Sequence, residues 1–142
     1  MIPFIIETDN FIGGRCMFFL YVILAIILVF AISTLIRHFQ QKKYLNVLTQ
    51  DEFIKGYRKA QLIDIREPQE FERGYIRGAR NLPLTQMKQR LVELRPDKPV
   101  YLYGQSNNRS KRAAHLLHKR DFQELYILDG GFKKWTGKVD VK

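Results

Sequence analysis

A run of twenty-one residues without a charge, from Cys16 to Ile36, restricts what this chain can form more than any other part of it. Phe, Leu, Ile, Val and Ala make up most of the run. As a helix rising about 1.5 Å per residue it would be roughly 31 Å long, which matches the ~30 Å hydrocarbon thickness of a bilayer. The sequence therefore predicts a transmembrane helix over residues 17–36, preceded by a short N-terminal segment, residues 1–16.

Two alternatives for this run are a cleaved secretory signal and a buried helix of a soluble core. The apolar region of a signal is usually about 7–15 residues long and ends at a cleavage site with small residues. Here the run is longer, Glu7 and Asp9 precede it, and no clear site of that kind follows before Arg37. A buried helix would need a partner core that the rest of the chain does not supply. We therefore favour an uncleaved, single-pass anchor.

The cations that flank the run predict its orientation. Arg15 is the only Lys or Arg before it, whereas Arg37, Lys42 and Lys43 follow it closely. Because the cytoplasmic flanks of membrane helices carry the excess of Lys and Arg, the C-terminal part is expected in the cytoplasm. Residues 37–45 are too polar to be buried, and we expect them to continue the helix as a basic juxtamembrane stalk. The expected location is the cell membrane, with lipid as the partner of the span.

The charge of the chain also bears on its partners. The net charge is +10, and residues 46–142 contribute +8 of it, from twenty Lys and Arg against twelve Asp and Glu. Beside a membrane anchor, each such cation contributes about 1 kcal/mol of attraction to anionic lipid. Nucleic-acid binding would need a clustered basic stripe or stacking aromatics, and neither is evident, so no nucleic-acid partner is expected. The group Arg109, Lys111 and Arg112 favours an anionic ligand or an acidic protein surface, or is a solvated helix face.

Metal and redox chemistry find little support in the sequence. Cys16 is the only cysteine, which excludes an internal disulfide and a cysteine zinc site. His115 and His118 are three residues apart, but no third ligand is near, so we expect surface or packing roles for them. No metal and no cofactor are expected.

After residue 45 the sequence alternates between strand and helix patterns. Thr49 and Glu52 have the spacing of a capping box, which predicts a helix running towards Arg58. Pro68 suits the first turn of a brief helix to Arg73, and Thr85 is expected to cap a helix that runs through Leu94. A further helix is expected over residues 110–120, and strands over residues 61–65, 79–82, 100–103 and 125–128. Such alternation predicts an α/β domain with a parallel sheet covered on both faces.

The segment Tyr103 to Ser110, Tyr-Gly-Gln-Ser-Asn-Asn-Arg-Ser, joins an expected strand to an expected helix. Ligands of parallel sheets bind beyond the carboxyl ends of the strands, where residues 104–109 would lie. Free backbone N–H groups and the helix dipole attract anions to such a place. The loop therefore has the outline of an anion cradle, but it holds no cysteine with which to attack a substrate.

Three ordered motifs across residues 46–142 resemble the rhodanese family of sulfurtransferases. They are the series from Asp64 to Pro83, the loop just described with its following Ala113 and Ala114, and the run from Leu128 to Trp135. The resemblance implies a three-layer domain over residues 46–142, with a central parallel sheet flanked by helices. Gly104 stands where the family has its catalytic Cys. Asn107 replaces a family Gly and Tyr75 a family His.

The resemblance also implies roles for particular residues. It makes the loop an anion-binding site formed by Gly104, Gln105, Ser106, Asn107, Asn108, Arg109 and Ser110, with no catalytic residue. It gives a structural role to Asp64, Arg66 and Glu70, which would order the sheet edge and an adjacent helix by ion pairing, and to Gly130, Gly131 and Trp135. The four residues between Gly104 and Arg109 match the sulfur-transferring members, whereas related cell-cycle phosphatases have one more.

Persulfide transfer needs a thiolate, and glycine has no side chain to supply one. We therefore expect a domain that is inactive as a sulfurtransferase and binds a protein partner or a small oxyanion. One alternative is an enzyme whose sulfur-carrying Cys comes from a partner, or in which Ser106 and Arg109 support another reaction. Another is a purely architectural tether.

Overall fold

The computed structural model describes residues 9–142 of the chain, which divides after Gln40 into two compact units. The first unit is formed by helix α1, Asp9–Tyr44, whose last residues belong to the second unit. The helix therefore continues through residues 37–44, as expected of the stalk, and it begins within the segment expected to precede the span. The expectation that residues 37–45 are not buried was wrong for Tyr44, which is buried in the core of the second unit. Residues 1–8 of that N-terminal segment lie outside the described residues.

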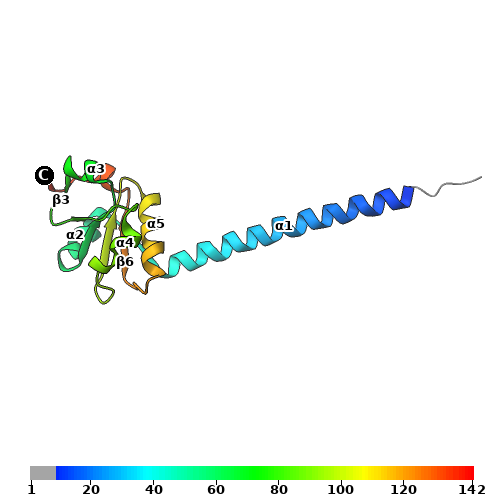
Figure 1. The fold of residues 1–142 in the computed structure, drawn as a ribbon, viewed down its shortest axis with the longest axis horizontal. Helices are drawn as coiled ribbons and strands as arrows, with labels where there is room; N and C mark the ends of the chain where they lie inside the picture. Colours follow the sequence, from blue (N-terminus) through cyan, green and yellow to red (C-terminus); the bar gives the residue numbers. More distant parts are fainter. Residues whose placement is uncertain (1–8) are drawn as a thin grey trace, which may run out of the picture. The chain divides into compact units, whose positions relative to one another are not determined.

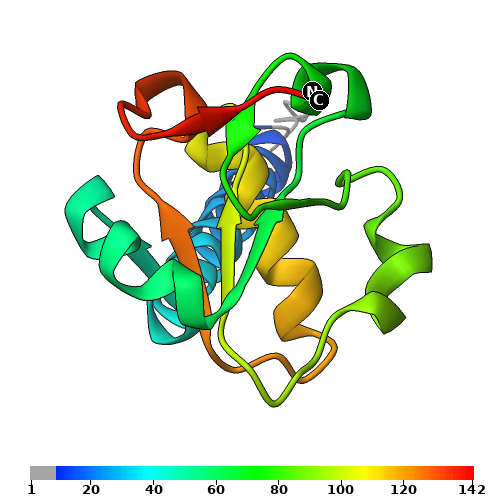
Figure 2. The same ribbon diagram turned by 90° about the vertical axis from the view of Figure 1, so that its left-hand side faces the viewer.

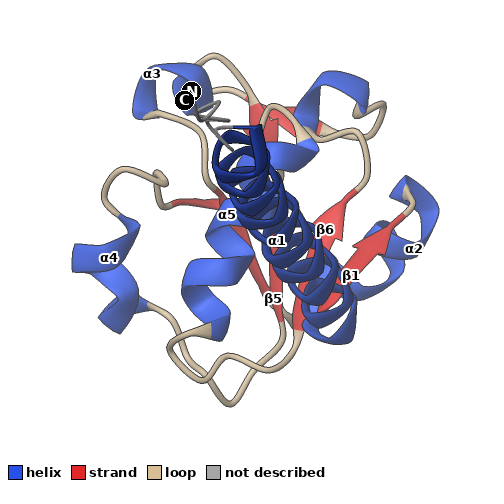
Figure 3. Ribbon diagram, turned by 90° about the vertical axis from the view of Figure 1, so that its right-hand side faces the viewer, coloured by secondary structure: helices blue, strands red, loops and turns tan. Residues whose placement is uncertain are grey.

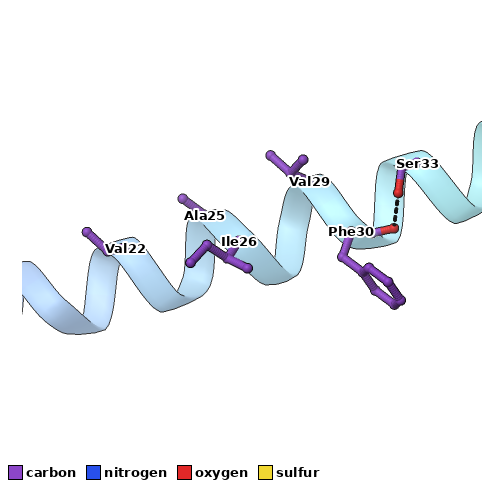
Figure 4. A pocket seen from close by; sticks show the side chains of 6 residues that line it. All are labelled: Val22, Ala25, Ile26, Val29, Phe30 and Ser33. Atoms are coloured by element: carbon purple, nitrogen blue, oxygen red, sulfur yellow. Dashed lines mark hydrogen bonds between the residues drawn. The ribbon is translucent and has the colours of Figure 1, made fainter.

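Within α1, the stretch Gly14–Gln40 is long and apolar enough to cross a bilayer, with a mean hydropathy of 2.9 in its most apolar window. The core helix of a soluble protein and a signal sequence near an N-terminus pass the same test of length and composition. The Ser33 and Thr34 hydroxyl groups in the Gly14–Gln40 stretch form hydrogen bonds within the helix itself. Ser33 Oγ donates to the Phe30 carbonyl oxygen at 2.8 Å (Figure 4). Thr34 Oγ1 donates in the same way to the Ala31 oxygen at 2.8 Å. Such internal bonds suit an apolar surrounding, where water is absent.

The second unit contains a five-stranded parallel sheet with the strand order β1-β6-β5-β2-β4. Helix α2, Gln50–Gly56, and helix α5, Asn107–His118, lie on opposite sides of β6 (Figure 1). In chain order its strands are β1 Leu45–Leu48, β2 Gln61–Asp64, β4 Arg80–Asn81, β5 Val100–Tyr103 and β6 Leu125–Leu128. A second, two-stranded antiparallel sheet pairs β3 Tyr75–Ile76 with β7 Val139–Asp140. The connections between the strands contain α2 Gln50–Gly56, η1 Tyr57–Lys59, α3 Pro68–Glu72, α4 Met87–Arg90, η2 Leu91–Glu93, α5 Asn107–His118 and η3 Phe132–Lys134.

Alternating side chains of the central strands build a core on each face of the sheet. On one face, Ile63, Leu102 and Ile127 pack with Ala113 and Leu117 of α5, the side seen in Figure 3. On the other face, Leu62, Tyr101 and Leu128 pack with Phe53 of α2, the side seen in Figure 2. This arrangement confirms the predicted α/β fold with a parallel sheet between two layers.

Several predicted elements agree closely with the structure. Strands β5 and β6 have the expected bounds, and α3 begins at Pro68. The capping box at α2 is present, since Glu52 N donates to Thr49 Oγ1 at 3.5 Å and Thr49 N donates to Glu52 Oε2 at 2.9 Å.

Several expectations were wrong in detail. The helix expected from Thr85 through Leu94 is a short α4 followed by the 3-10 turn η2, and the small sheet of β3 and β7 was not predicted. Strand β1, Leu45–Leu48, was not predicted, because a four-residue edge strand directly after a helix shows no alternation of its own. Helix α5 begins at Asn107 rather than residue 110, so the second half of the predicted loop is its first turn. Thr85 does not cap α4, whose N-cap is Gln86. The Thr85 hydroxyl instead donates to Glu67 Oε1 at 3.2 Å.

Candidate functional site

The candidate site lies at the carboxyl end of β5, where residues 104–106 connect this central strand to α5. Strands β2 and β6 pair with β5 on either side, so Asp64 and Asp129 at or just after their ends flank the loop. Since α5 starts at Asn107, the site consists of a three-residue loop and the first helical turn.

Two glycines fix the path of the loop. Gly104 is buried, and its carbonyl oxygen accepts a hydrogen bond from Phe132 N at 2.8 Å. Gly131 packs directly beneath it, with a φ of +64°. A Cβ on Gly131 would lie 2.6 Å from the Gly104 oxygen and 2.7 Å from the Gln105 oxygen. Only glycine fits there, because such distances are far shorter than contact and the backbone is left-handed.

The backbone at Gly104 has room for a side chain. Its φ is not in the left-handed region, unlike that of Gly131. A Cβ built on it would lie 3.1 Å and 3.2 Å from two side-chain carbons of Ile65 and 3.4 Å from Ser110 Oγ. These are tight contacts that a shift of a few tenths of an ångström in Ile65 would relieve. The frame that would hold a nucleophile is therefore retained, although the only sulfhydryl of the chain is that of Cys16 in α1.

Asn107 ties the start of α5 to the segment after β6. Its Nδ2 donates to Asp129 Oδ1 at 2.8 Å, and its Oδ1 accepts from Gly130 N at 2.9 Å. The residue that departs from the family's glycine thus makes two side-chain bonds that glycine could not make. These bonds hold residues 129–131 against the loop.

The first turn of α5 leaves backbone donors without a side-chain cap. Ser106 is the N-cap of α5, but within the described residues its hydroxyl makes no hydrogen bond to the backbone amides that follow it. Ser110, by contrast, is fully buried, and its Oγ donates to the Ser106 carbonyl oxygen at 3.4 Å. Because the first N–H groups of a helix have no partner within it, those of α5 stay available to an acceptor from outside.

Charged side chains surround the mouth of the loop. Arg109, half exposed, lies 3.4 Å from Glu70 Oε2 of α3. This pair offsets part of the positive charge that Arg109 brings to the first turn. A concavity beside the loop is lined by Arg66, Glu70, Arg73, Gly74, Gln105 and Phe132.

A buried ion pair supports the site from below. Arg66 Nη2 lies 2.7 Å from Asp64 Oδ2, and both side chains are almost fully buried. The same Nη2 donates to the Gly74 oxygen at 2.6 Å, and the guanidinium lies 3.8 Å from the centre of the Phe132 ring. Glu70 is not part of this pair, since its ion-pair partner is Arg109. Asp64 and Arg66 thus connect the end of β2 to the segments after α3 and β6.

Tyr103, the last residue of β5, adds a second buried polar contact. Its hydroxyl accepts a hydrogen bond from Ile76 N at 3.1 Å, which joins β5 to the small sheet. Burial, and then the neighbouring Asp64 carboxylate, raise the pKa of Tyr103, so the phenol remains protonated at neutral pH. The sequence marked this residue only as part of a buried strand.

Trp135 lies farther from the loop. Its ring contacts Phe53 of α2 with the ring centres 6.4 Å apart, and its Nε1 donates to the Lys138 oxygen at 3.3 Å. Trp135 packs against the core on the α2 side of the sheet. Neither the contact with Phe53 nor the hydrogen bond to Lys138 involves the loop.

The two histidines of α5 pack against the end of α1. The ring of Tyr44 stacks on His118 with centres 3.8 Å apart, and its hydroxyl lies 3.0 Å from His115 Nδ1. Sequence reasoning gave these histidines packing or surface roles but did not find Tyr44 as their partner. Within residues 9–142, no cluster of three His, Cys, Asp or Glu side chains could hold a metal ion.

A family model for the rhodanese-like domain matches residues 49–138, which include every strand of the central sheet except β1 and all of the loop. The chain belongs to the rhodanese-like family. The resemblance found in the three sequence motifs is thereby confirmed.

Relatives with similar sequences include two proteins of Bacillus subtilis. The uncharacterized protein YqhL is 54% identical over 121 residues, covering 85% of this chain and 96% of that protein. This match is longer than the unit from Gln41 to Lys142, so it includes part of α1. The putative sulfur carrier protein YrkF is 32% identical over 79 residues, which span 56% of this chain and 43% of that protein.

Solved structures show the same fold. A rhodanese-related protein from Thermoplasma volcanium has a TM-score of 0.63 at 21% identity, covering 68% of this chain and 99% of that one. A thiosulfate sulfurtransferase from Pseudomonas aeruginosa has a TM-score of 0.61 at 26% identity, covering 68% of this chain but only 20% of that one.

Proposed function

We propose that this protein is a membrane-anchored, rhodanese-like binding module that does not transfer sulfur itself. In this proposal α1 crosses the cell membrane once, and residues 46–142 lie on the cytoplasmic side, where the loop and first turn of α5 receive an oxyanion. That oxyanion is a small free anion or an anionic group presented by a protein partner.

The observation that carries the proposal is the glycine at position 104 in an otherwise retained frame. The loop backbone is held by Phe132 N, by the close approach of Gly131 and by the two bonds of Asn107. Sulfur transfer requires a thiolate that attacks the donor and carries the sulfane sulfur. The frame offers backbone donors and cationic side chains for an anion, but no atom at residue 104 that could form that bond.

The anchor and its sidedness rest on separate arguments. Length and composition support a membrane span, and the excess of cations after it favours a cytoplasmic domain. Protease access in intact cells tests both parts. The domain should resist protease added outside to intact cells and be digested once the membrane is permeabilised. Digestion of the domain on intact cells would reverse the proposed orientation.

A sulfurtransferase assay tests the inactivity. The purified full-length protein in detergent should form no thiocyanate from thiosulfate and cyanide above background. Turnover by the protein alone would refute the proposal. Turnover that appears only when a cysteine-bearing protein, inactive by itself, is added would instead support the alternative in which a partner supplies the Cys.

Anion titration followed by NMR tests the binding site. Sulfate or thiosulfate at millimolar concentration should shift the backbone amides of residues 105–110. An Arg109→Gln variant should weaken the shifts, and Arg95→Gln, which removes an arginine of an exposed ion pair elsewhere, should not. Unchanged amides in the unmodified protein would refute anion binding at the loop.

A further inference from the structure

Helix α5 carries an exposed basic face that the proposed binding site does not use. Lys111, Arg112 and Lys119, the last of which is the C-cap, are all exposed. The opposite side of the helix is buried through Ala113 and Leu117. No Asp or Glu occurs anywhere in α5, from Asn107 to His118. We call Lys111, Arg112 and Lys119 the basic face.

Exposed cations without an ion-pair partner occur on the basic face and elsewhere in the described domain, for instance at Lys55, Arg58 and Lys59. What distinguishes the basic face is its place on the helix that contacts the end of α1. Six arginines of the domain are paired with carboxylates, Arg66 in the buried pair described above and Arg77, Arg80, Arg90, Arg95 and Arg109 in exposed pairs. Among the side chains that the structure describes, none of the three cations of the basic face lies within ion-pairing distance of a carboxylate. Their charge is therefore uncompensated within the protein.

The chain itself places the basic face close to the end of α1. Tyr44, the last residue of α1, packs on His118 and His115, and both histidines belong to the same helix as Lys111 and Arg112. Tyr44 follows Ile36, the last residue of the uncharged run, by only eight positions. Eight helical residues rise about 12 Å, and even fully extended they reach no more than about 28 Å. If α1 spans the bilayer, the end of α5 that holds Tyr44 lies near the headgroup layer.

We propose that the basic face of α5 docks on anionic lipid headgroups of the membrane that α1 crosses. Lipid is favoured over an acidic protein because the anchor holds this helix within reach of a charged surface at all times. Within about 8 Å, the screening length at physiological salt, each cation contributes about fivefold to the docking equilibrium. The three cations together contribute roughly 100-fold. Docking in this way also brings the first turn of α5, and with it the candidate anion site, to the membrane surface.

The docking proposal rests on the membrane anchor of the proposed function. The test examines the anchor and the docking separately. The full-length protein is placed in nanodiscs of phosphatidylcholine alone or mixed with phosphatidylglycerol, each with a trace of a lipid bearing gadolinium on its headgroup. Paramagnetic relaxation of backbone amides then reports which helices approach the lipid surface. In anionic nanodiscs, amides of α5 should relax more strongly than those of α2, which packs on the opposite face of the sheet. In phosphatidylcholine alone this difference should fall.

A matched pair of triple variants completes the test. Replacing Lys111, Arg112 and Lys119 by Gln should abolish the preference for anionic nanodiscs, a loss of about 100-fold in the docking equilibrium. Replacing Lys55, Arg58 and Lys59 by Gln removes the same charge from α2 and η1 and should leave the relaxation of α5 unchanged.

The outcomes separate the two proposals. A chain that does not stay with the nanodiscs would refute the anchor. A chain that stays but shows equal relaxation of α5 and α2 would refute docking alone. Equal enhancement of α5 in both lipid compositions, or an equal effect of the two triple variants, would also overturn it, because proximity to the anchor would then suffice without the basic face.

Discussion

Restoring a thiol at position 104 should convert the retained frame into one that accepts sulfur. In Gly104→Cys, the new Cβ meets Ile65 at 3.1 Å and Ser110 Oγ at 3.4 Å. Mild overpacking of this kind costs about 1 kcal/mol, and the reduced entropy of the unfolded chain offsets about 0.5 kcal/mol of it. We expect a net loss of about 0.5–1 kcal/mol in the free energy of unfolding, or a fall of at most ~8 °C in Tm.

The new thiol would lie at the uncapped start of α5, where backbone N–H groups and the helix dipole stabilise a thiolate. An ordinary thiol with a pKa of about 8.5 is roughly 3% ionised at pH 7, whereas a pKa of about 7 gives half thiolate. The rate of alkylation against pH measures this pKa, and intact mass after thiosulfate treatment detects an added sulfur atom. Cys16→Ser in all samples removes the other thiol.

Gly104→Ser is the matched control, since it adds the same Cβ and a hydroxyl that forms no persulfide. It should share the change in Tm and gain no sulfur. A folded Gly104→Cys variant with an ordinary thiol pKa and no bound sulfur would refute the argument that the cradle is intact. Asn107 is left in place, because Asn107→Gly would lose two hydrogen bonds to residues 129 and 130.

Three further predictions concern stability, followed by thermal and urea unfolding. Gly131→Ala should destabilise the domain by more than about 2 kcal/mol, since its Cβ clashes with loop backbone and its φ is left-handed; an unchanged Tm would contradict the close approach. Asp64→Ala should cost about 3–5 kcal/mol by leaving the guanidinium of Arg66 buried and unpaired, whereas Asp97→Ala, in an exposed pair, should cost less than about 1 kcal/mol; equal losses would argue against this difference in burial. Hydrogen bonds from the N-cap residue of α2 lower the pKa of Glu52, so their stabilisation is present above the ordinary pKa of a glutamate and is lost as pH falls through the lowered value; Glu52→Gln should remove this acid dependence, and its persistence would exclude Glu52 as the source.

The sequence predicted the parts of the fold that local patterns specify. Buried strands such as Val100–Tyr103 are continuous apolar runs, and the capping box at Thr49 is a local signal, so both were placed correctly. Strand β1 depends instead on pairing with β6, some eighty residues later, and has no local signal. The family resemblance gave the position of the loop and showed that Gly104 stands where the family has its catalytic Cys.

What the sequence did not supply were contacts between distant residues. Asn107 was placed in the loop without these bonds, because its partners, Asp129 and Gly130, come after another strand and are not apparent from spacing. The stacking of Tyr44 on His118 joins residues from two helices in the same way. Such contacts between distant residues depend on the order of the strands in the sheet. The hydrophobic periodicity within one segment therefore cannot predict them.

The bonds of Asn107 affect how this protein could evolve. Two of the four glycine codons differ from a cysteine codon by one base, so from either of these a mutation at position 104 reaches a thiol in a single step. Return of the family glycine at position 107 would instead sacrifice both contacts of its amide. Variants that gain a thiol at position 104 are therefore expected to keep Asn107, because its two contacts hold the loop whatever residue 104 carries.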